Sequence, residues 1–461
     1  MGQLTRAVGE FISGMSFDAL PPSAIRAVKN ALADYAGVTV LGRYEQVTRI
    51  VSSFETTGSV GEARVLFSRQ RASARSAALI NGTSGHALDY DDVGIAFHPA
   101  HPSVVIAPAI FAQAERMGAS GRDLITAYVT AYEVWSELAS RDEDPQHING
   151  WHPTGVFGTI AAAAGVAKLL RLGVEGSIRA VAIAASQAAG LGANFGTMTK
   201  PFHAGHAAAS GLMAAQYANA GMTSNPGMFD DPRGFLFAVS PRGKVDFRRS
   251  AHFSDGLHIL DWGMSVKLYP MCYATHRILD TLIPYANHEN LQADEIDSVL
   301  FRTGPSRVVP LVHVDPRNSL DAKFSAEFAI AMSIIARRAT LSELNDDFVN
   351  RADIRGLMGK VTRELDPARD MASFKEEPDD DLVFCMRDGS TQVLKLAAPR
   401  DQAISLAPHT LWLKFMDCTS TAMDAVTARQ LFDSIQSLEF LEDVNKLPAP
   451  QLAADPPMGA I

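Results

Sequence analysis

Several predicted helices of this chain are crowded with small side chains, and this limits how the chain can fold. The segments AAAAGVA (161–167), AIAASQAAG (182–190) and HAAASGLMAA (206–215) consist mostly of Ala, Gly and Ser. Small side chains let helix axes approach closely, which favours a compact bundle around buried helices. Continuous β patterns are scarce before residue 260, apart from ARVLF at 63–67. The first part of the chain is therefore predicted to be helical.

Helical patterns cover much of these first 260 residues. The segment 21–42 opens with Pro and Ser and then places Ile25, Val28 and Leu32 at helical spacing. Similar patterns predict helices at about 45–57, 73–89, 102–118, 120–141, 155–173, 175–190 and 201–221.

The pattern changes near residue 260. A helix is predicted from about 271, a strand at 296–303, and two or three helices between about 320 and 360. A hairpin is predicted at 381–397, with its turn at Asp388-Gly389. Helix returns at about 420–444 and is expected to rejoin the first bundle. The Pro/Ala-rich tail at 447–461 is expected to be mobile.

Composition excludes several classes of protein. The chain has 461 residues, long for one domain, and its net charge of −10 is spread without a Lys/Arg block. This argues against a nucleic-acid partner or a polybasic membrane anchor. No uncharged apolar run approaches the roughly 20 residues of a membrane span, and the N-terminus lacks the apolar segment of a secretory signal. The three cysteines lie far apart in the sequence, which fits free thiols in a reducing compartment. We therefore expect a cytoplasmic enzyme.

The residues suited to chemistry are concentrated in two segments, 81–103 and 194–211. Seven of the thirteen histidines lie between His86 and His206. An acidic run occupies 89–92, in a neighbourhood of Ala, Gly and Val. Because unpaired charged groups are costly to bury, the pattern predicts a polar pocket, which is the usual form of an enzyme site. The alternative is a set of unrelated surface histidines on loops.

Two patterns in the sequence resemble cofactor or metal sites. GLGANFG (190–196) is one residue off the dinucleotide fingerprint and does not follow a strand, so we reject it. His98–His101 and His203–His206 have an i,i+3 spacing that metal ligands use, with the acidic run nearby. A metal-dependent hydrolase is therefore an alternative. Since the H-E-x-x-H motif is missing and His98 precedes a proline, no metal site is predicted.

Two lysines in apolar contexts indicate the kind of substrate. Lys200 lies in TMTKPFH and Lys267 precedes LYPMCYATH. Ammonium groups pair with carboxylates and stabilise the charge that develops when a proton leaves a neighbouring carbon. Histidine, with an ordinary pKa of about 6.5, suits that proton transfer. His152 also opens an Ala-rich helix, whose N-terminus favours an anion. We therefore expect a site for a small di- or tricarboxylate.

At these residues the chain resembles the MmgE/PrpD family, whose members include 2-methylcitrate dehydratase, cis-aconitate decarboxylase and iminodisuccinate epimerase. The matching stretches are GHALDYDD (85–92), HPAHPS (98–103), GWHPTGVFGT (150–159), GTMTKPFHAGHAA (196–208), KLYPMCYATH (267–276) and DPRNSLDAKFS (315–325). They occur in the family's order over most of the chain.

The resemblance implies a mainly α fold in two domains. A large all-helical domain would be built from both chain ends, residues 1–265 and 406–461, and a smaller α+β lid would span 266–405. It also implies a homodimer and no metal or organic cofactor. The pocket of the family's decarboxylases uses an aspartate, two histidines and two lysines, which match Asp89, His101, His152, Lys200 and Lys267 here. We expect His203 to support Lys200, and His203, Tyr273 and His276 to bind the substrate.

Two departures from the family pattern leave the reaction open. Val93 follows the acidic run where the family often has Thr, and Phe328 stands where dehydratases and decarboxylases tend to have Tyr. We expect a cofactor-independent lyase of the hydro-lyase type that abstracts a proton next to a carboxylate. An epimerase of a succinate-type acid and a decarboxylase of a cis-aconitate-like acid are alternatives, and a non-catalytic binding protein is the rival outside the enzymes.

Overall fold

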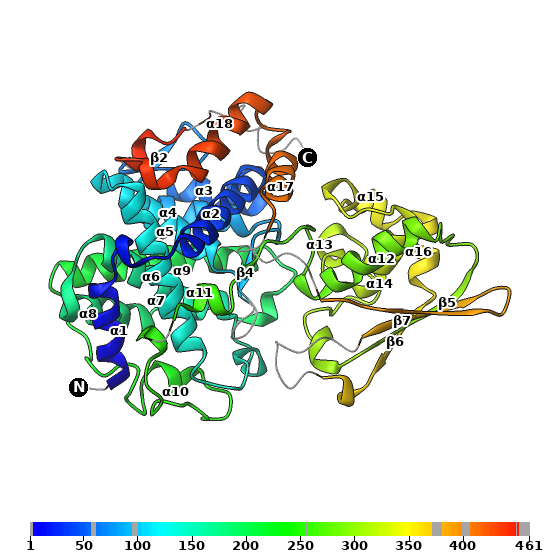
Figure 1. Cartoon of the computed structure of the whole chain (residues 1–461), viewed down its shortest axis with the longest axis horizontal. Helices are drawn as coiled ribbons and strands as arrows, with labels where there is room; N and C mark the ends of the chain where they lie inside the picture. Colours follow the sequence, from blue (N-terminus) through cyan, green and yellow to red (C-terminus); the bar gives the residue numbers. More distant parts are fainter. Residues whose placement is uncertain are drawn as a thin grey trace. The chain divides into compact units, whose positions relative to one another are not determined.

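The computed structural model describes residues 3–56, 61–94, 100–254, 256–370, 380–398, 406–448 and 450 (Figure 1). The chain forms two compact units. Unit 1 consists of Met1–Asn194, Met198–Val266 and Gln402–Ile461, and unit 2 consists of Phe195–Thr197 and Lys267–Asp401.

Unit 1 is helical, and with it the prediction of a mainly α fold is confirmed. Its helices are α1 (Gln3–Gly14), α2 (Pro22–Gly42), α3 (Gln46–Glu55), α4 (Ala74–His86), α5 (Ser103–Met117), α6 (Gly121–Ala139), α7 (Pro153–Leu169), α8 (Gly173–Ala185), α9 (Thr199–Asn219), α10 (Phe235–Val239), α11 (His258–Asp261), α17 (Pro408–Thr419) and α18 (Ala425–Gln436). Its strands form two short antiparallel pairs, β1 (Ala63–Arg64) with β2 (Arg71–Ala72) and β3 (Val93–Gly94) with β4 (Met264–Ser265). In the part of the chain that the structure describes, we find no helix with the length and apolar character needed to cross a bilayer.

Helix α9 packs against both α4 and α7, and glycines let the backbones touch. A Cβ on Gly205 would lie 2.2 Å from the carbonyl oxygen of Leu79 in α4. On the other side, a Cβ on Gly211 would lie 2.4 Å from the carbonyl oxygen of Thr159 in α7. Such distances exclude any larger residue unless the helices separate. The small-residue segments of the sequence therefore do form closely packed helices.

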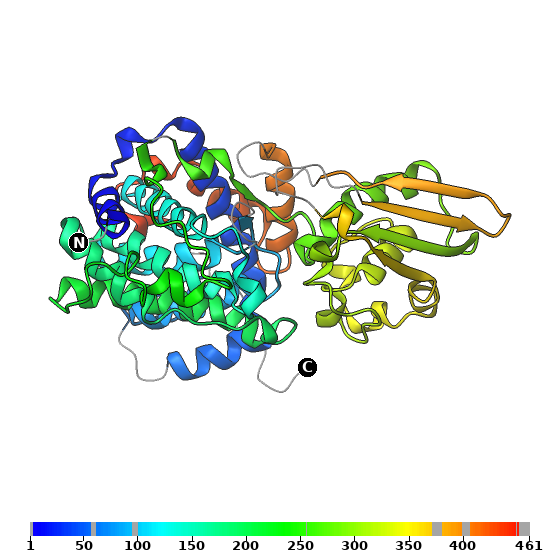
Figure 2. The same cartoon turned by 90° about the horizontal axis from the view of Figure 1, so that it is seen from below.

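The C-terminal helices α17 and α18 pack on α2, the second helix of the chain (Figure 2). Both chain ends therefore contribute to unit 1. The predicted helix at about 420–444 is shorter in the structure, where α18 spans Ala425–Gln436. Of the tail at 447–461, residues 449 and 451–461 lie outside the described residues.

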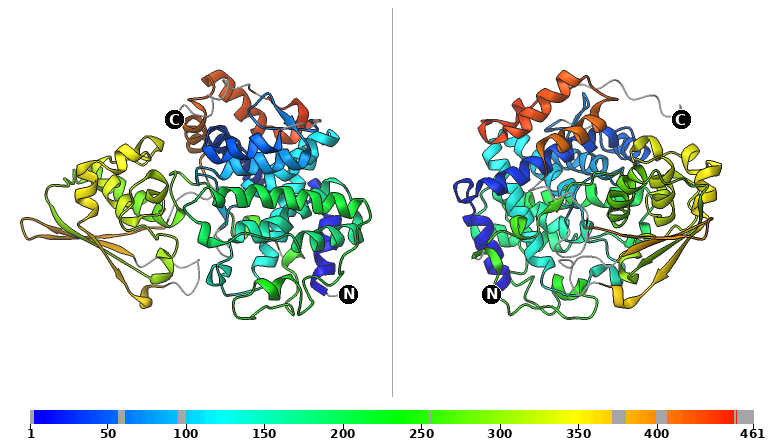
Figure 3. Two further views of the ribbon diagram at one scale, coloured as in Figure 1. Left: turned by 180° about the vertical axis from the view of Figure 1, so that it is seen from behind. Right: turned by 45° about the vertical axis from the view of Figure 1, so that its right-hand side comes forward.

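Unit 2 combines helices with a four-stranded sheet. Its elements are α12 (His276–His288), β5 (Ile296–Thr303), α13 (Ser319–Ala322), α14 (Ala326–Ile335), α15 (Asp346–Val349), α16 (Ala352–Met358), β6 (Val361–Leu365), β7 (Asp381–Met386) and β8 (Thr391–Lys395). The strand order is β6-β5-β7-β8, with β5 and β6 parallel and the other neighbours antiparallel. Helices α12, α14 and α16 lie on one face of this sheet (Figure 3). The predicted strand at 296–303 is confirmed, and so is the hairpin, in which Gly389 has a φ of 88° at the turn.

Two further predicted elements are shorter in the structure, and each predicted range includes a residue with a left-handed backbone conformation. The strand predicted at 63–67 ends after two residues, and Phe67 has a φ of 58°. The helix predicted at 73–89 ends at His86, and Asp89 has a φ of 54°. Neither an α-helix nor a strand can continue through such a residue.

The contact between α4 and α9 can be tested with Gly205→Ala. The added methyl group would meet the backbone of α4, so we expect the free energy of unfolding of unit 1 to fall by about 3 kcal/mol. Gly14→Ala is the control, because a Cβ there meets nothing within 4 Å. Chemical denaturation would compare the two variants. Equal stability of both would contradict the close approach of the two helices.

Candidate active site

The site residues predicted in unit 1 come together where α4 ends and where α5, α7 and α9 begin. Lys200 is the second residue of α9 and His203 lies one turn further along the helix. His152 immediately precedes α7, and its backbone N–H donates to the carbonyl oxygen of Gly190 at 3.0 Å. Asp89 follows α4 and His101 precedes α5. All five side chains are buried.

Lys200 and Asp89 form a buried ion pair, with 2.7 Å between Nζ and Oδ1. Nε2 of His101 lies 3.6 Å from the same carboxylate oxygen. Asp89 makes these contacts from its left-handed backbone conformation, which few residues other than glycine adopt and which Asp tolerates better than most. Since a buried ammonium group is costly without a counter-charge, Asp89 compensates the charge of Lys200.

Asp91 connects two imidazoles. Its Oδ1 lies 2.9 Å from Nδ1 of His86, and its Oδ2 lies 2.9 Å from Nδ1 of His101. Nδ1 of His101 also lies 3.0 Å from the backbone carbonyl oxygen of Asp92. Because a carboxylate only accepts, both rings present a proton on Nδ1 and leave Nε2 as the acceptor in the neutral state.

Burial and neighbouring charges together shift the pKa values of this cluster. It lowers the pKa of His86 to about 4, although the carboxylate of Asp91 acts in the opposite direction. Burial also raises the pKa of Asp91, but His86 and His101 outweigh it and hold the pKa well below the usual range of a carboxyl group. At neutral pH, His86 is therefore neutral and Asp91 is ionised.

His152 and His203 extend the cluster. Their Nδ1 atoms are 3.1 Å apart, so one of them donates a hydrogen bond to the other. Burial, followed by the charge of Lys200, puts the pKa of His152 well below its usual range. Burial also lowers the pKa of His203, to about 4. The ring centroids are 4.4 Å apart for His86 and His101, 6.1 Å for His86 and His152, and 5.3 Å for His152 and His203, so the four imidazoles form a row.

The third carboxylate of the acidic run has different surroundings. Asp92 accepts from the hydroxyl of Ser103 and, at 3.2 Å, from its backbone N–H. The same hydroxyl lies 2.5 Å from that of Tyr128. Burial, followed by the charge of Asp34, raises the pKa of Asp92 well above its usual range. Val93 follows in β3, opposite Ser265 of β4.

The remaining predicted residues belong to unit 2. Lys267 and His276 are fully buried, and the ring of His276 lies 5.0 Å from that of Tyr273. That Lys267, Tyr273 and His276 join the site of unit 1 stays a prediction. Phe328 lies in the hydrophobic core of unit 2, with its ring 6.3 Å from Phe348 in a T-shaped arrangement.

Sequence reasoning did not assign roles to His86 and Asp91, although both lie in the matching stretch 85–92. Their Nδ1–carboxylate contact spans five residues and depends on the chain reversal at Asp89. The signal was the pairing of a helix-terminal histidine with a downstream aspartate.

The four residues His86, Asp89, Asp91 and His101 place ligand atoms within 4.8 Å of one another, which is compact enough for a metal ion. However, Asp91 already binds both imidazoles, and the ammonium of Lys200 adjoins Asp89. The ammonium of Lys200 opposes a second cation beside Asp89, and the carboxylate oxygens of Asp91 are already used by the two imidazoles. His98, the other histidine of the i,i+3 pair with His101, lies outside the described residues.

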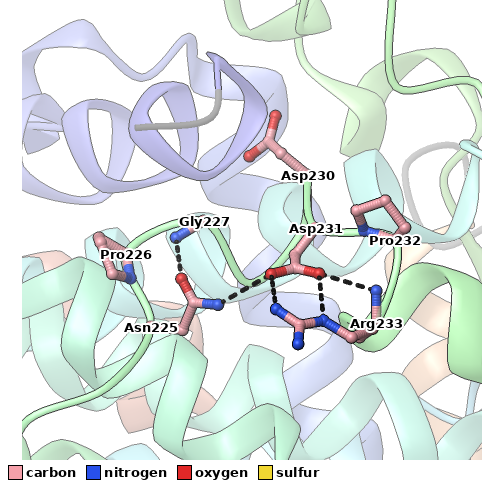
Figure 4. Close-up of a pocket in the computed structure, with 7 residues that line it drawn as sticks. All are labelled: Asn225, Pro226, Gly227, Asp230, Asp231, Pro232 and Arg233. Carbon is pink, nitrogen blue, oxygen red and sulfur yellow. Dashed lines mark hydrogen bonds and ion pairs between the residues drawn. The ribbon is translucent and has the colours of Figure 1, made fainter.

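A separate surface depression of about 560 Å³ lies on unit 1 and is lined by residues of the segment 225–233 (Figure 4). Its polar groups are satisfied locally, since Asp231 accepts from the side chains of Asn225 and Arg233. Asp230 accepts from backbone N–H groups at the start of α1. None of the predicted site residues lines this depression.

The charge states can be tested by titration. With pKa values lowered to about 4, His86 and His203 should stay neutral from pH 8 down to about 5 and become charged only below that. Long-range ¹H–¹⁵N NMR spectra of the histidine rings report this directly. The solvent-accessible His288 serves as the reference signal of an imidazole outside the cluster. A midpoint near 6.5 for His86 would contradict the buried, neutral cluster.

Comparison with known proteins agrees with the motifs of the sequence. The MmgE/PrpD N-terminal domain matches residues 6–248 and the MmgE/PrpD C-terminal domain matches residues 269–439. Cis-aconitate decarboxylase of Mus musculus is 27% identical, covering 96% of this chain and 92% of that protein. The Homo sapiens protein of the same name is 26% identical over 98% and 95%, and that of Aspergillus terreus is 23% identical over 96% and 95%. These relatives are enzymes, and this chain belongs to the MmgE/PrpD family.

Proposed function

We propose that the protein is a cofactor-independent lyase of a small di- or tricarboxylate, and that its reaction is decarboxylation of a cis-aconitate-like acid. The observation that carries this proposal is a buried ammonium group, Lys200, beside a row of four buried imidazoles. The proposal draws further support from relatives named cis-aconitate decarboxylase along the whole chain.

Lys200 would bind a carboxylate of the substrate. In the free protein its ammonium is paired with Asp89, and a substrate carboxylate would compete for it. The ammonium would then stabilise the negative charge that develops during reaction, because it is fixed and largely shielded from water. Lys267, which we expect to join the site, would bind a second carboxylate of a polycarboxylic acid.

The imidazoles would transfer the proton. When the bond to the departing carboxylate breaks, its electron pair stays on the substrate carbon and CO₂ leaves. That carbon must then take up a proton, which His101 or His152 would deliver from Nε2. Asp91 would stabilise the charged form of His101 through Nδ1, 2.9 Å away. His203 would return a proton to His152 from Nδ1 across their 3.1 Å contact while its own Nε2 takes up a proton from water.

The same groups also suit the hydro-lyase reaction and epimerisation, which start with abstraction of a proton next to a carboxylate. The buried phenyl ring at Phe328 supplies no hydroxyl donor, which is the specific reason to test these alternatives beside decarboxylation. We further propose a homodimer, on the basis of the family resemblance.

Turnover in D₂O followed by NMR would separate these reactions. We expect cis-aconitate to lose CO₂ and its product to carry one deuterium at the protonated carbon. Citrate, methylcitrate, tartrate and iminodisuccinate-type acids should be tested in parallel, since water loss or inversion of one of them would replace decarboxylation by the alternative reaction. Absence of turnover with every acid would overturn the enzyme proposal.

Lys200→Met should lower kcat/KM by about two to three orders of magnitude, as expected for removal of a group that stabilises developing charge. Lys244→Met is the matched control, because Lys244 is a mostly exposed lysine of the same unit, 4.0 Å from Asp144. Its kcat/KM should stay within about twofold of the wild-type value, as for most surface substitutions. Similar kinetics for both variants would exclude Lys200 from the reaction.

His203→Ala should lower kcat by about ten- to a hundredfold with little change in KM, because it interrupts the supply of protons to His152. Added imidazole should restore part of the rate. His206→Ala is the control on the same helix, and we expect wild-type kinetics from it. If imidazole has no effect on the rate of His203→Ala, the role of His203 is structural.

A further inference from the structure

A buried ion pair lies behind the acidic run. Asp34 in α2 and Lys414 in α17 form this pair, with 0% and 4% of their side chains exposed. Nζ of Lys414 also donates to the backbone carbonyl oxygen of Tyr90 at 2.7 Å. The same ammonium lies 4.2 Å from the centre of the Tyr90 ring. Lys414 therefore binds the chain at the residue between Asp89 and Asp91.

At neutral pH this ion pair lowers the stability of the folded state. Burial raises the pKa of Asp34 to about 6, even though Lys414 acts in the opposite direction and the nearby Asp91 adds to the rise. A carboxyl group with a raised pKa favours folding below its unfolded pKa of about 4, and this contribution is lost as the pH rises through 6. At neutral pH the ionised Asp34 therefore lowers the free energy of unfolding. Proteins in which apolar residues replace a buried ion pair are often equally stable or more stable. A gain in stability therefore does not explain the presence of the Asp34–Lys414 pair.

Its position suggests another role. Asp89 and Asp91 bind Lys200 and the two imidazoles, and the backbone between them is held by Lys414. Asp89 has a φ of 54°, a left-handed conformation that residues with a side chain seldom adopt. Such a conformation persists only where its surroundings enforce it.

We propose that the Asp34–Lys414 pair is a positioning device of the active site, which fixes Tyr90 and thereby holds Asp89 against Lys200 and Asp91 between its histidines. Both residues act through the backbone and neither touches the substrate. The proposal deepens the proposed function and relies on it for the effect on turnover.

The test replaces the pair by apolar residues of similar size, Asp34→Leu with Lys414→Met. Since such replacements of buried ion pairs are often neutral or stabilising, the melting temperature should be kept. We expect kcat to fall at least tenfold, because the acidic run loses its anchor. The matched control is Lys29→Met with Glu439→Leu. It removes another ion pair between α2 and the C-terminal segment, in which Nζ of Lys29 lies 2.7 Å from Oε1 of Glu439. That variant should retain wild-type kcat.

A second variant, Asp34→Asn with Lys414→Gln, removes both charges but keeps a side-chain donor for the carbonyl of Tyr90. It should recover most of the rate that the Leu/Met variant loses. This comparison also remains informative if the Leu/Met variant is destabilised. Equal kcat for wild type, the Leu/Met variant and the Asn/Gln variant would overturn the proposal.

A measurement without substrate separates this proposal from the proposed function. The imidazole Nδ1–H signals of His86 and His101, which report their hydrogen bonds to Asp91, should shift or disappear in the Leu/Met variant and stay in the Lys29/Glu439 control. Unchanged signals would show that the pair does not position the acidic run, whatever reaction the protein catalyses.

Discussion

The direct contact between the backbones of α4 and α9 is the constraint on which the active site depends. At Gly82 and Gly205 the two helices approach so closely that a Cβ on Gly82 would lie 2.8 Å from the Cα of Gly205. His86 is one turn beyond Gly82, and Lys200 is little more than one turn before Gly205. The end of one helix and the start of the other are thereby brought within reach of side-chain contacts. Larger residues at these glycines would separate the groups that pair in the site.

Close packing also determines the electrostatics. Helices lined by Ala and Gly exclude water from the histidines, and burial is the largest cause of their lowered pKa values. A neutral imidazole with a low pKa is a weak base, so it needs help to hold a proton during reaction. Asp91 gives that help to His86 and His101, while Asp89 balances the charge of Lys200. Among the described residues, Lys200 with its partner Asp89 thus adjoins buried imidazoles, of which His86, His152 and His203 have lowered pKa values.

Local patterns in the sequence predicted much of the fold. They predicted the contacts within the candidate site less completely. Helical spacing placed α4, α7 and α9 to within a few residues, and Asp388-Gly389 marked the turn of the hairpin. The structure brings together Asp89, His101, His152, Lys200 and His203, which were chosen from the sequence. The contact of Asp91 with two imidazoles and that of Lys414 with Tyr90 were not predicted. The first requires the left-handed turn at Asp89, and the second joins residues 324 positions apart through the packing of α17 on α2. Apart from the short spacing of His86 and Asp91 along the chain, neither contact leaves a local pattern.

We propose that Lys200 and the adjoining imidazoles bind a polycarboxylate. A crystal structure with an unreactive tricarboxylate, propane-1,2,3-tricarboxylate, tests it most directly. We predict one of its carboxylates within hydrogen-bonding distance of Nζ of Lys200, in competition with Asp89, and a second oxygen facing His101 or His152. A ligand bound elsewhere, with the contact of 2.7 Å between Lys200 and Asp89 unchanged, would contradict the account.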